Sequence, residues 1–563
     1  MNIAIETRTA KQASVHDPEW WRGAVIYQIY PRSFQDSNGD GIGDLPGITK
    51  RLAYIADLGA DAIWLSPFFT SPMKDFGYDV SDYRDVDPIF GTLADFDALV
   101  AEAHRLGLKV IIDQVLSHTS DLHPWFKESR SSRTNPKADW YVWADPEPDG
   151  TPPNNWLSVF GGPSWEWDSR RRQFYMHNFL IEQPDLNFHN REVQDALLDA
   201  VKFWLDRGVD GFRLDTVNFY FHDQELRSNP PDREMQSVAA DGDTASDHRL
   251  HTNPYNFQDH VYDKNRPENF GFLKRLRALL EQYPGAAAVG EVGEDSSRSL
   301  EIMAAYTSGR DKLHMCYTFD FLGGSFSARH FRSTVERVEA EAKDGWPCWS
   351  FSNHDVTRYV SRWGAYTSDP ARLAKLMASL ILSLKGSASL YEGEELGLTE
   401  ADIAYEDLVD PSGIRFWPDY KGRDGCRTPM VWESKAPNGG FTTGKPWLPI
   451  PPEHLPLAAD QQIAARESIF QHYRRFLHFR RTQPVLIKGS IDFLEAAGEV
   501  IAFRRDFEGA AMLCVFNLSR EPATFDLPAG LLAETIKDLG FAGKIENGRV
   551  SLGGQEAFFA RLR

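Results

Sequence analysis

Short apolar runs of strand length alternate with amphipathic segments along most of this chain. The segments between the runs, such as residues 93–107 and 193–208, repeat their apolar residues with the period of a helix. This alternation is typical of a parallel sheet whose strands are joined by right-handed crossovers. Eight runs of this kind begin near residues 24, 60, 108, 209, 286, 313, 347 and 382. The sequence therefore predicts the α/β fold class, as a (β/α)8 TIM barrel.

Three stretches depart from this alternation. Residues 119–182 are rich in Trp, Pro, Asn and Ser and lack a helical period, and they are too long for an ordinary loop. We therefore expect an inserted subdomain after strand 3. A second irregular subdomain is expected at about residues 391–455, after the eighth strand, and residues 228–256 are expected to form a loop that caps the barrel mouth.

The C-terminal part of the chain has a different pattern. Residues 484–563 alternate apolar and polar side chains in runs that are separated by Gly and Pro. This pattern predicts a C-terminal antiparallel β-sandwich. The barrel would then be built from residues 1–118 and 183–483.

Charge and hydropathy exclude several classes of partner. The chain carries 81 acidic and 61 basic residues, a net charge of −20, which repels phosphate backbones and anionic lipids. We therefore expect no nucleic acid partner and no membrane. The absence of a long apolar run and of a secretory pattern in the N-terminal residues favours a soluble, cytoplasmic protein. We expect a monomer or homodimer with reduced, buried thiols at Cys316, Cys348, Cys426 and Cys514.

Acidic residues close three of the predicted strands, where the catalytic groups of a TIM barrel lie: Asp215, Glu291 and Asp355. Arg213 lies on the same side of its strand as Asp215 and would keep that carboxylate ionised. The apolar strand before Glu291 would raise its pKa, so that it holds a proton at neutral pH. One ionised and one protonated carboxyl is the pair that glycoside cleavage requires. Taken singly, each acid fits a structural ion pair or a helix cap equally well.

Six motifs together make the chain resemble the α-amylase superfamily, glycoside hydrolase family 13, and within it the α-glucosidase and oligo-1,6-glucosidase branch. They occur in the family's order: DQVLSH (113–118), QPDLN (183–187), GFRLDTVNF (211–219), GEVGE (290–294), SNHD (352–355) and YEGEELG (391–397). The resemblance implies that Asp215 is the nucleophile, that Glu291 is the general acid/base and that Asp355 holds the ring hydroxyls of the sugar. It also implies that the glucosyl subsite is lined by His118, His354 and Arg213.

The same resemblance implies exo action on small-molecule α-glucosides. The segment KDFGYDVSDY (74–83) is similar to the exo-acting branch, in which an Asp at the position of Asp75 and an Arg in GRDGCRTPM (422–430) grip the terminal glucose. We assign this Arg to Arg423 rather than Arg427.

Aromatic residues near these motifs resemble the walls of the family's sugar pocket. Tyr78 is implied to be a stacking platform, and Phe160 and Phe179 to be further pocket walls, with ordinary core packing as the alternative. Thr216 follows the nucleophile, where this branch has Val in enzymes that prefer α-1,6 bonds and Ala or Thr in those that prefer α-1,4 bonds. The resemblance therefore implies maltose, sucrose and short malto-oligosaccharides as substrates, with transglucosylation as a side activity.

Residues 36–44 resemble the first half of a Ca²⁺ loop, with oxygen ligands at alternate positions and Gly at the turn. The twelfth position is Gly47, where an EF-hand carries a bidentate Glu. The family resemblance implies one structural divalent cation, calcium first and magnesium second, held by Asp36, Asn38, Asp40, Asp44 and the Ile42 carbonyl. An Asx-rich turn without an ion is the alternative. Ser117 replaces the Asn of a second amylase calcium site, so that site is not expected, and neither is an organic cofactor.

Two other functions remain open from the sequence. A dedicated transglucosidase or disaccharide isomerase would use the same acids but deliver the glucosyl group to an acceptor other than water. A non-catalytic scaffold subunit of a membrane transporter is a more distant relative. Such relatives carry a membrane anchor and lose catalytic acids, whereas this chain retains all three.

Overall fold

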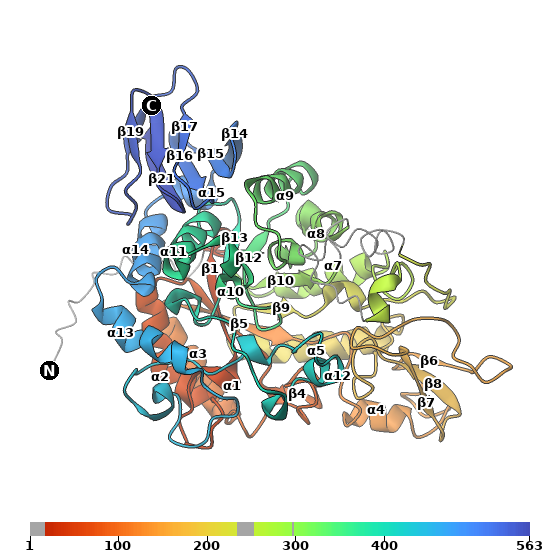
Figure 1. The fold of residues 1–563 in the computed structure, drawn as a ribbon. Helices are drawn as coiled ribbons and strands as arrows, with labels where there is room; N and C mark the ends of the chain where they lie inside the picture. The colour runs from red at the N-terminus through yellow and green to blue at the C-terminus, as the bar shows by residue number, and fades with distance from the viewer. Residues whose placement is uncertain (1–16, 233–252, 295–297) are drawn as a thin grey trace.

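The centre of the molecule is a barrel of eight parallel strands surrounded by helices (Figure 1). The computed structural model describes residues 17–232, 253–294 and 298–563. The barrel strands run in the order β11-β10-β9-β5-β2-β1-β13-β12, and a single parallel bridge from Cys316 to Pro347 joins the two ends. Their bounds are β1 Val25–Ile29, β2 Ala62–Leu65, β5 Lys109–Gln114, β9 Gly211–Leu214, β10 Ala287–Val292, β11 Met315–Thr318, β12 Cys348–Ser350 and β13 Ser387–Tyr391. The predicted TIM barrel is confirmed, with a strand in each of the eight predicted runs.

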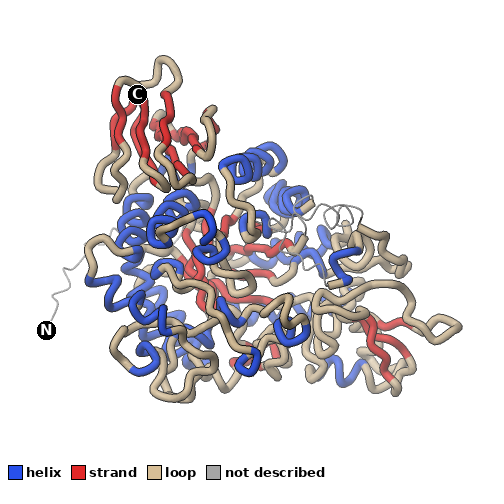
Figure 2. The backbone as a smooth tube through the Cα atoms, viewed as in Figure 1, coloured by secondary structure: helices blue, strands red, loops and turns tan. Residues whose placement is uncertain are grey.

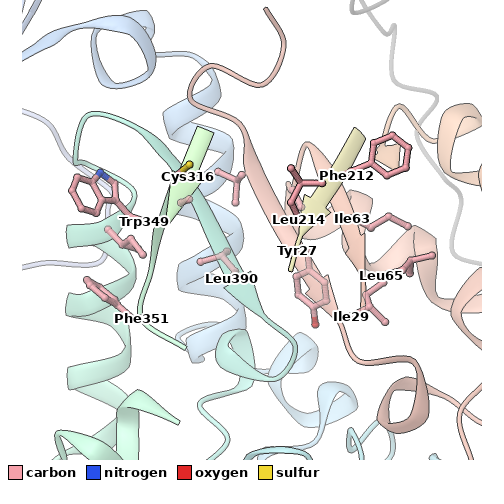
Figure 3. Packing of buried hydrophobic residues seen from close by; sticks show 14 of the residues in the cluster. Tyr27, Ile29, Ile63, Leu65, Phe212, Leu214, Cys316, Trp349, Phe351 and Leu390 are labelled. Carbon is pink, nitrogen blue, oxygen red and sulfur yellow. The ribbon is translucent and has the colours of Figure 1, made fainter. Parts of the chain in front are cut away.

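Alternate residues of each barrel strand pack on opposite faces. In β1, Tyr27 and Ile29 belong to the outer layer between strands and helices, which Figure 3 shows, whereas Ile26 belongs to the barrel interior. Trp21 and Trp346 join the interior cluster with their rings edge to face, 6.4 Å apart. Because both faces of the strands are buried, the strands appear in the sequence as continuous apolar runs.

The helices around the barrel begin at side-chain caps in most cases. Thr92 and Asp95 form a reciprocal capping box at the start of α3, and Asn190 caps α5. The main outer helices are α2 Leu45–Leu58, α3 Leu93–Arg105, α5 Arg191–Asp206, α7 Asn269–Leu280, α8 Ser299–Thr307, α9 Ala328–Glu341, α11 Pro370–Ile381 and α14 Ile469–Arg481.

Residues 119–182 leave the barrel after β5 and return before α5. They carry helix α4 (Pro124–Ser129) and a three-stranded antiparallel sheet of β6 (Trp143–Ala144), β8 (Gln173–Met176) and β7 (Trp165–Asp168). Trp156 and Trp165 stack in an apolar cluster of this insertion, at 5.9 Å. In Figure 1 the insertion stands to one side of the barrel.

Two further stretches border the barrel mouth. Residues 391–455 contain short 3-10 turns and one short helix, α12 (Pro411–Arg415). The loop expected to cap the mouth over 228–256 lies partly outside the described residues, because 233–252 are not described. Of the rest of that loop, Pro231 pairs with Gln258 in an isolated bridge.

The C-terminal residues form two antiparallel sheets after the short helix α15 (Pro484–Lys488). The larger contains β14 (Ser490–Leu494), β15 (Val500–Phe507), β16 (Ala510–Asn517), β21 (Glu556–Leu562) and β18 (Ala533–Thr535), and the smaller contains β17 (Ala523–Asp526), β20 (Arg549–Leu552) and β19 (Lys544–Glu546). Val515, Phe525 and Val550 are part of a buried cluster that draws on both sheets. Figure 2 shows these strands standing apart from the barrel strands.

All four cysteines are free and buried. Within the described residues, no helix combines the length and the apolar character that crossing a bilayer requires.

Candidate active site

A cavity of about 330 Å³ opens at the carboxyl ends of the barrel strands. The carboxyl side chains that line it include the three acids predicted from the strand ends: Glu291 within β10, Asp215 directly after β9, and Asp355 after β12. In a TIM barrel the strand ends meet at this face, which brings residues from distant parts of the chain together. We call this cavity the glucosyl pocket, after the ligand that the resemblance implies.

The Arg213 guanidinium joins the two acids predicted to be catalytic. Its Nη1 lies 2.7 Å from Asp215 Oδ1, and its Nη2 lies 2.6 Å from Glu291 Oε2. Nη1 also contacts Asp113 at 2.9 Å, and Nη2 donates to the Tyr317 hydroxyl. Arg213 is fully buried and lies beneath the pocket rather than on its wall.

The charges of the two acids are coupled. Burial raises the pKa of Asp215 to about 7 and that of Glu291 to about 7, while the positive charge of Arg213 opposes both shifts. We expected Arg213 to single out Asp215 as the ionised group. Because the guanidinium contacts both carboxyls, it favours ionisation of either one, and the pair takes up its first proton as a unit.

Asp355 carries the third carboxyl of the pocket in a different environment. Burial acts to raise its pKa, but the positive charges of Arg423 and Arg427 outweigh burial and hold the pKa below its usual value. Arg427 Nη2 donates to Asp355 Oδ1 at 2.8 Å, and Arg423 Nη1 donates to the same oxygen at 3.2 Å. Asp355 is therefore an anion at neutral pH.

Arg423 also closes one end of the pocket. Its Nη2 donates to Asp75 Oδ1 at 2.8 Å and to Asp410 Oδ1 at 2.7 Å. Asp75 and Arg423 both line the pocket. Arg427, the alternative for this role, is almost fully buried behind the wall, where its Nε donates to the His354 carbonyl. The structure therefore places Arg423, and not Arg427, beside Asp75.

Aromatic rings form much of the remaining wall. Tyr78 lies parallel to His354, with ring centres 5.4 Å apart, and its hydroxyl donates to Asp113. Phe160 and Phe179 line the pocket with their rings 5.9 Å apart. The three rings predicted to form the wall thus face one cavity, and Phe179 also contacts Phe219 at 5.5 Å.

The two motif histidines are buried and uncharged. Burial lowers the pKa of His118 to about 4 and lowers that of His354 well below its ordinary value. His118 lines the pocket, and its Nδ1 pairs with Ser117 Oγ at 2.8 Å. His354 lies beneath Tyr78 and pairs with Gln28 through Nδ1. Of the residues expected to line the glucosyl subsite, His118 does so, whereas His354 and Arg213 support it from below.

Thr216 has an unusual backbone. Its φ of 39° and ψ of 51° are left-handed, which β-branched residues rarely adopt. The Thr216 N–H donates to Glu291 Oε2 at 3.1 Å, and its hydroxyl donates to Asp215 Oδ2 at 3.3 Å. The residue therefore contacts both acids of the pair.

Asp113, Tyr317 and Asp410 are among the residues of the site that were not predicted. Asp113 lies in the DQVLSH motif and Tyr317 within a predicted strand, so the positions were visible but their contacts with Arg213 were not. Asp410, fully buried against Arg423, comes from the irregular stretch 391–455 and has no sequence signal.

The loop of residues 36–44 folds on itself through its own side chains. The Asp36 carboxylate accepts hydrogen bonds from the amides of Asn38, Gly39 and Gly41 and from the Thr442 hydroxyl. Asp44 caps helix α2 by accepting from the Gly47 amide at 2.7 Å. Within the described ranges, no three His, Cys, Asp or Glu side chains converge on a metal position. Oxygen donors suited to a hard cation are present, but binding would have to use Asn38 and carbonyl oxygens as well as carboxylates.

Known proteins resemble the chain over almost its whole length. The model of the alpha-amylase catalytic domain matches residues 28–489. A probable alpha-glucosidase of Rhizobium meliloti is 60% identical and covers 97% of this chain and 98% of its own. An oligo-1,6-glucosidase of Heyndrickxia coagulans is 37% identical, with 91% and 94% covered. The crystal structure of an alpha-glucosyl transfer enzyme matches with a TM-score of 0.92 and 56% identity, over 97% of this chain and 99% of that one. A trehalulose synthase of Pseudomonas mesoacidophila matches with a TM-score of 0.85 and 33% identity, over 97% and 99%.

Proposed function

The chain belongs to the alpha-amylase family, glycoside hydrolase family 13, and from this premise we propose that it is an exo-acting, retaining α-glucosidase that releases glucose from the non-reducing end of short α-glucosides. The observation that carries the proposal is the contact of one guanidinium, Arg213, with both Asp215 at 2.7 Å and Glu291 at 2.6 Å. It holds two carboxyls together at the wall of one cavity, as glycoside cleavage by a carboxylate pair requires.

In the proposed reaction, Asp215 attacks the anomeric carbon while Glu291 gives its proton to the departing oxygen. Water then opens the ester between the sugar and Asp215, and Glu291, now a carboxylate, takes a proton from that water. The configuration at the anomeric carbon is retained. Arg213 contacts both acids, so its charge stabilises whichever of them is ionised at each step.

The anionic Asp355 is positioned to accept hydrogen bonds from ring hydroxyls, because it lines the pocket and two arginines already hold it in place. Exo action is supported by the end of the pocket that Asp75 and Arg423 close through their ion pair at 2.8 Å. A pocket closed at this end admits one glucosyl unit, which gives glucose as the product.

We propose maltose, sucrose and short malto-oligosaccharides as substrates, with α-1,4 bonds cleaved faster than α-1,6 bonds. The residue that supports this preference is Thr216, next to the nucleophile and in contact with both acids. Val at this position would present two methyl groups where Thr offers a hydroxyl to Asp215.

Transfer of glucose to other acceptors is a second candidate activity. It is favoured by the likeness to the alpha-glucosyl transfer enzyme, at 56% identity. The pocket is also lined by Tyr255, Phe219 and Phe319, rings that suit an organic acceptor better than water. A non-catalytic scaffold role is disfavoured, because Asp215, Glu291 and Asp355 are all present in the pocket.

We also propose that residues 36–44 hold one structural divalent cation, with calcium preferred to magnesium. Support comes from the oxygen donors of Asp36, Asn38, Asp40, Asp44 and the Ile42 carbonyl in one tight loop, whose Gly39 and Gly41 have φ of 86° and 94°. The cation would stiffen the loop that precedes α2, far in sequence from the catalytic pair, and takes no part in the proposed reaction.

Product anomers test the proposal directly. The protein is incubated with maltose, isomaltose and sucrose, each alone and with an alcohol acceptor, and the first products are followed by NMR. We expect α-glucose to appear before β-glucose, and maltose to be cleaved faster than isomaltose. β-Glucose as the first product would refute retention, faster cleavage of isomaltose would refute the linkage preference, and glucosides that outweigh free glucose would identify a transglucosidase.

A further inference from the structure

A second cavity, which we call the outer groove, lies beside the glucosyl pocket. This groove on the surface is lined by Phe160, Leu180, Val409, Pro411, Ile414 and Arg415. Phe160 lines both this outer groove and the glucosyl pocket. Val409 and Ile414 are 38% and 45% exposed, so the groove is an apolar depression open to solvent. The ring of Phe160 therefore lies between the interior of the pocket and the surface.

Successive residues of one segment face opposite sides of this wall. Asp410 binds Arg423, and Ser412 lines the glucosyl pocket. Val409, Pro411 and Ile414 line the outer groove instead. Because neighbouring residues face the two cavities, the wall is one peptide segment thick beside Phe160.

A turn of the insertion holds Phe160 in the wall. Gly161 and Gly162 follow it with φ of 88° and 83°, a conformation that side chains disfavour. A Cβ on Gly161 would lie 2.9 Å from Phe416 Cζ and 3.0 Å from Arg415 Nε. The end of α12 therefore packs directly on the glycine turn, which fixes the position of the ring. In Figure 1, α12 lies beside the insertion.

On its inner side, the ring contacts the residues that close the pocket. The Arg423 guanidinium lies 5.2 Å from the centre of the Phe160 ring, and Phe179 contacts the ring edge to face. Asp75 and Arg423 line the glucosyl pocket but not the outer groove. Phe160 therefore borders both the pocket and the outer groove, whereas Asp75 and Arg423 border only the pocket.

We infer that the Phe160 ring completes the closed end of the pocket beside the Asp75–Arg423 pair, and that the outer groove becomes a subsite for a second glucose unit of an α-glucan once the ring is removed. The inference rests on the proposed α-glucosidase activity. Leu180, Val409 and Ile414 offer an apolar surface for one face of a pyranose, and Arg415 offers donors for its hydroxyls.

A maltoside with a blocked end tests this role of the Phe160 ring. In 4-nitrophenyl α-maltoside whose non-reducing glucose carries a 4,6-O-ethylidene group, exo attack is blocked and only cleavage beside nitrophenol gives colour. The wild-type protein should leave it intact, because the blocked glucose has no space beyond the pocket. In Phe160→Ala this unit enters the outer groove, and kcat/KM for nitrophenol release should rise at least tenfold over the wild-type value.

Leu180→Ala is the matched control, because Leu180 lines only the outer groove. Alone it should leave kcat/KM for 4-nitrophenyl α-glucoside within twofold of wild type and give no activity on the blocked maltoside. Combined with Phe160→Ala, it should reduce the gain. A Phe160→Ala protein that cleaves the glucoside but not the blocked maltoside overturns the inference.

If the Phe160→Ala variant is inactive on both substrates, a binding measurement tests the inference instead. Calorimetry with the blocked maltoside should then show binding at least tenfold tighter than to the wild-type protein, and equal or absent binding overturns the inference. Failure of the wild-type protein on 4-nitrophenyl α-glucoside would instead refute the proposed function, which separates the two outcomes.

Discussion

The backbone N–H of Thr216 donates a hydrogen bond to Oε2 of Glu291 at 3.1 Å. The amide reaches from the end of β9 to a residue of β10, and Thr216 has a left-handed backbone. A left-handed conformation costs an L-residue roughly 1–2 kcal/mol. The residue that follows one acid of the pair thus contacts the other, and its backbone is strained.

The strained backbone of Thr216 predicts that Gly is at least as stable as Ala at this position, the reverse of their order within a helix. Thr216→Gly should melt at least as high as Thr216→Ala, because Gly adopts positive φ freely, whereas Ala retains a strain of about 1 kcal/mol. Ala101→Gly, at an exposed position of helix α3, should instead lower the melting temperature. Thermal scans at one heating rate provide the comparison. A Thr216→Ala protein more stable than Thr216→Gly would show that the backbone is not strained there.

The hydroxyl of Tyr317 should affect the alkaline limb of the pH profile. It donates to Glu291 Oε1 at 2.9 Å, which favours the ionised carboxylate. The acid must be protonated, so kcat/KM should fall as pH rises through its pKa of about 7. In Tyr317→Phe the donor is lost, the pKa rises and the alkaline limb should move to higher pH. The measurement is kcat/KM for 4-nitrophenyl α-glucoside from pH 4 to pH 10, and an alkaline limb that stays in place or moves down would contradict it.

Glu394 predicts how stability depends on pH. Burial raises its pKa to about 8 in the folded protein, above its value in the unfolded chain. The folded state therefore binds this proton more tightly, and the stability gained from it is lost as pH rises through about 8. Glu394→Gln cannot lose a proton, so its melting temperature should fall less than that of wild type between pH 6 and pH 9, by roughly a few degrees. Glu467→Gln, at an exposed position, should follow wild type.

The cation proposal predicts stabilisation by calcium. At a concentration one hundred times the dissociation constant, a bound ion adds about 2.7 kcal/mol of stability. A chelator should therefore lower the melting temperature, and added Ca²⁺ should restore it more fully than Mg²⁺. Asp36→Ala should abolish the response, whereas Asp82→Ala, at an exposed position outside the loop, should not. Equal melting temperatures with and without chelator would leave the loop as an ion-free Asx turn.

The barrel strands and the positions of two of the acids could be predicted from the sequence, for a physical reason. Strands buried on both faces carry continuous apolar runs, and catalytic side chains of a TIM barrel lie where those runs end, so position alone made Asp215 and Glu291 candidates. The pairing of Asp75 with Arg423 came from motif resemblance, since 348 residues separate the two.

Contacts between side chains from distant segments could not be predicted from the sequence. The sequence predicted a contact of Arg213 with Asp215 alone. The contact between Arg213 and Glu291 forms only because β10 lies beside β9. Asp410 comes from a stretch without periodicity, which predicts no position for any side chain. The left-handed φ of Thr216 has no signal either, because β-branched residues normally indicate extended backbone. Each of these features needed the packed structure.

The barrel is closed between β11 and β12 by the single bridge from Cys316 to Pro347. The sheet thus has a seam, and the pocket straddles it: Asp215 and Glu291 are anchored on one flank, and Asp355 follows the strand on the other. Opening of this seam would separate Asp215 and Glu291, the proposed nucleophile and acid, from Asp355, the proposed sugar-binding carboxylate. Amide hydrogen exchange in β11 and β12 therefore reports how often the seam opens and the two halves of the site come apart.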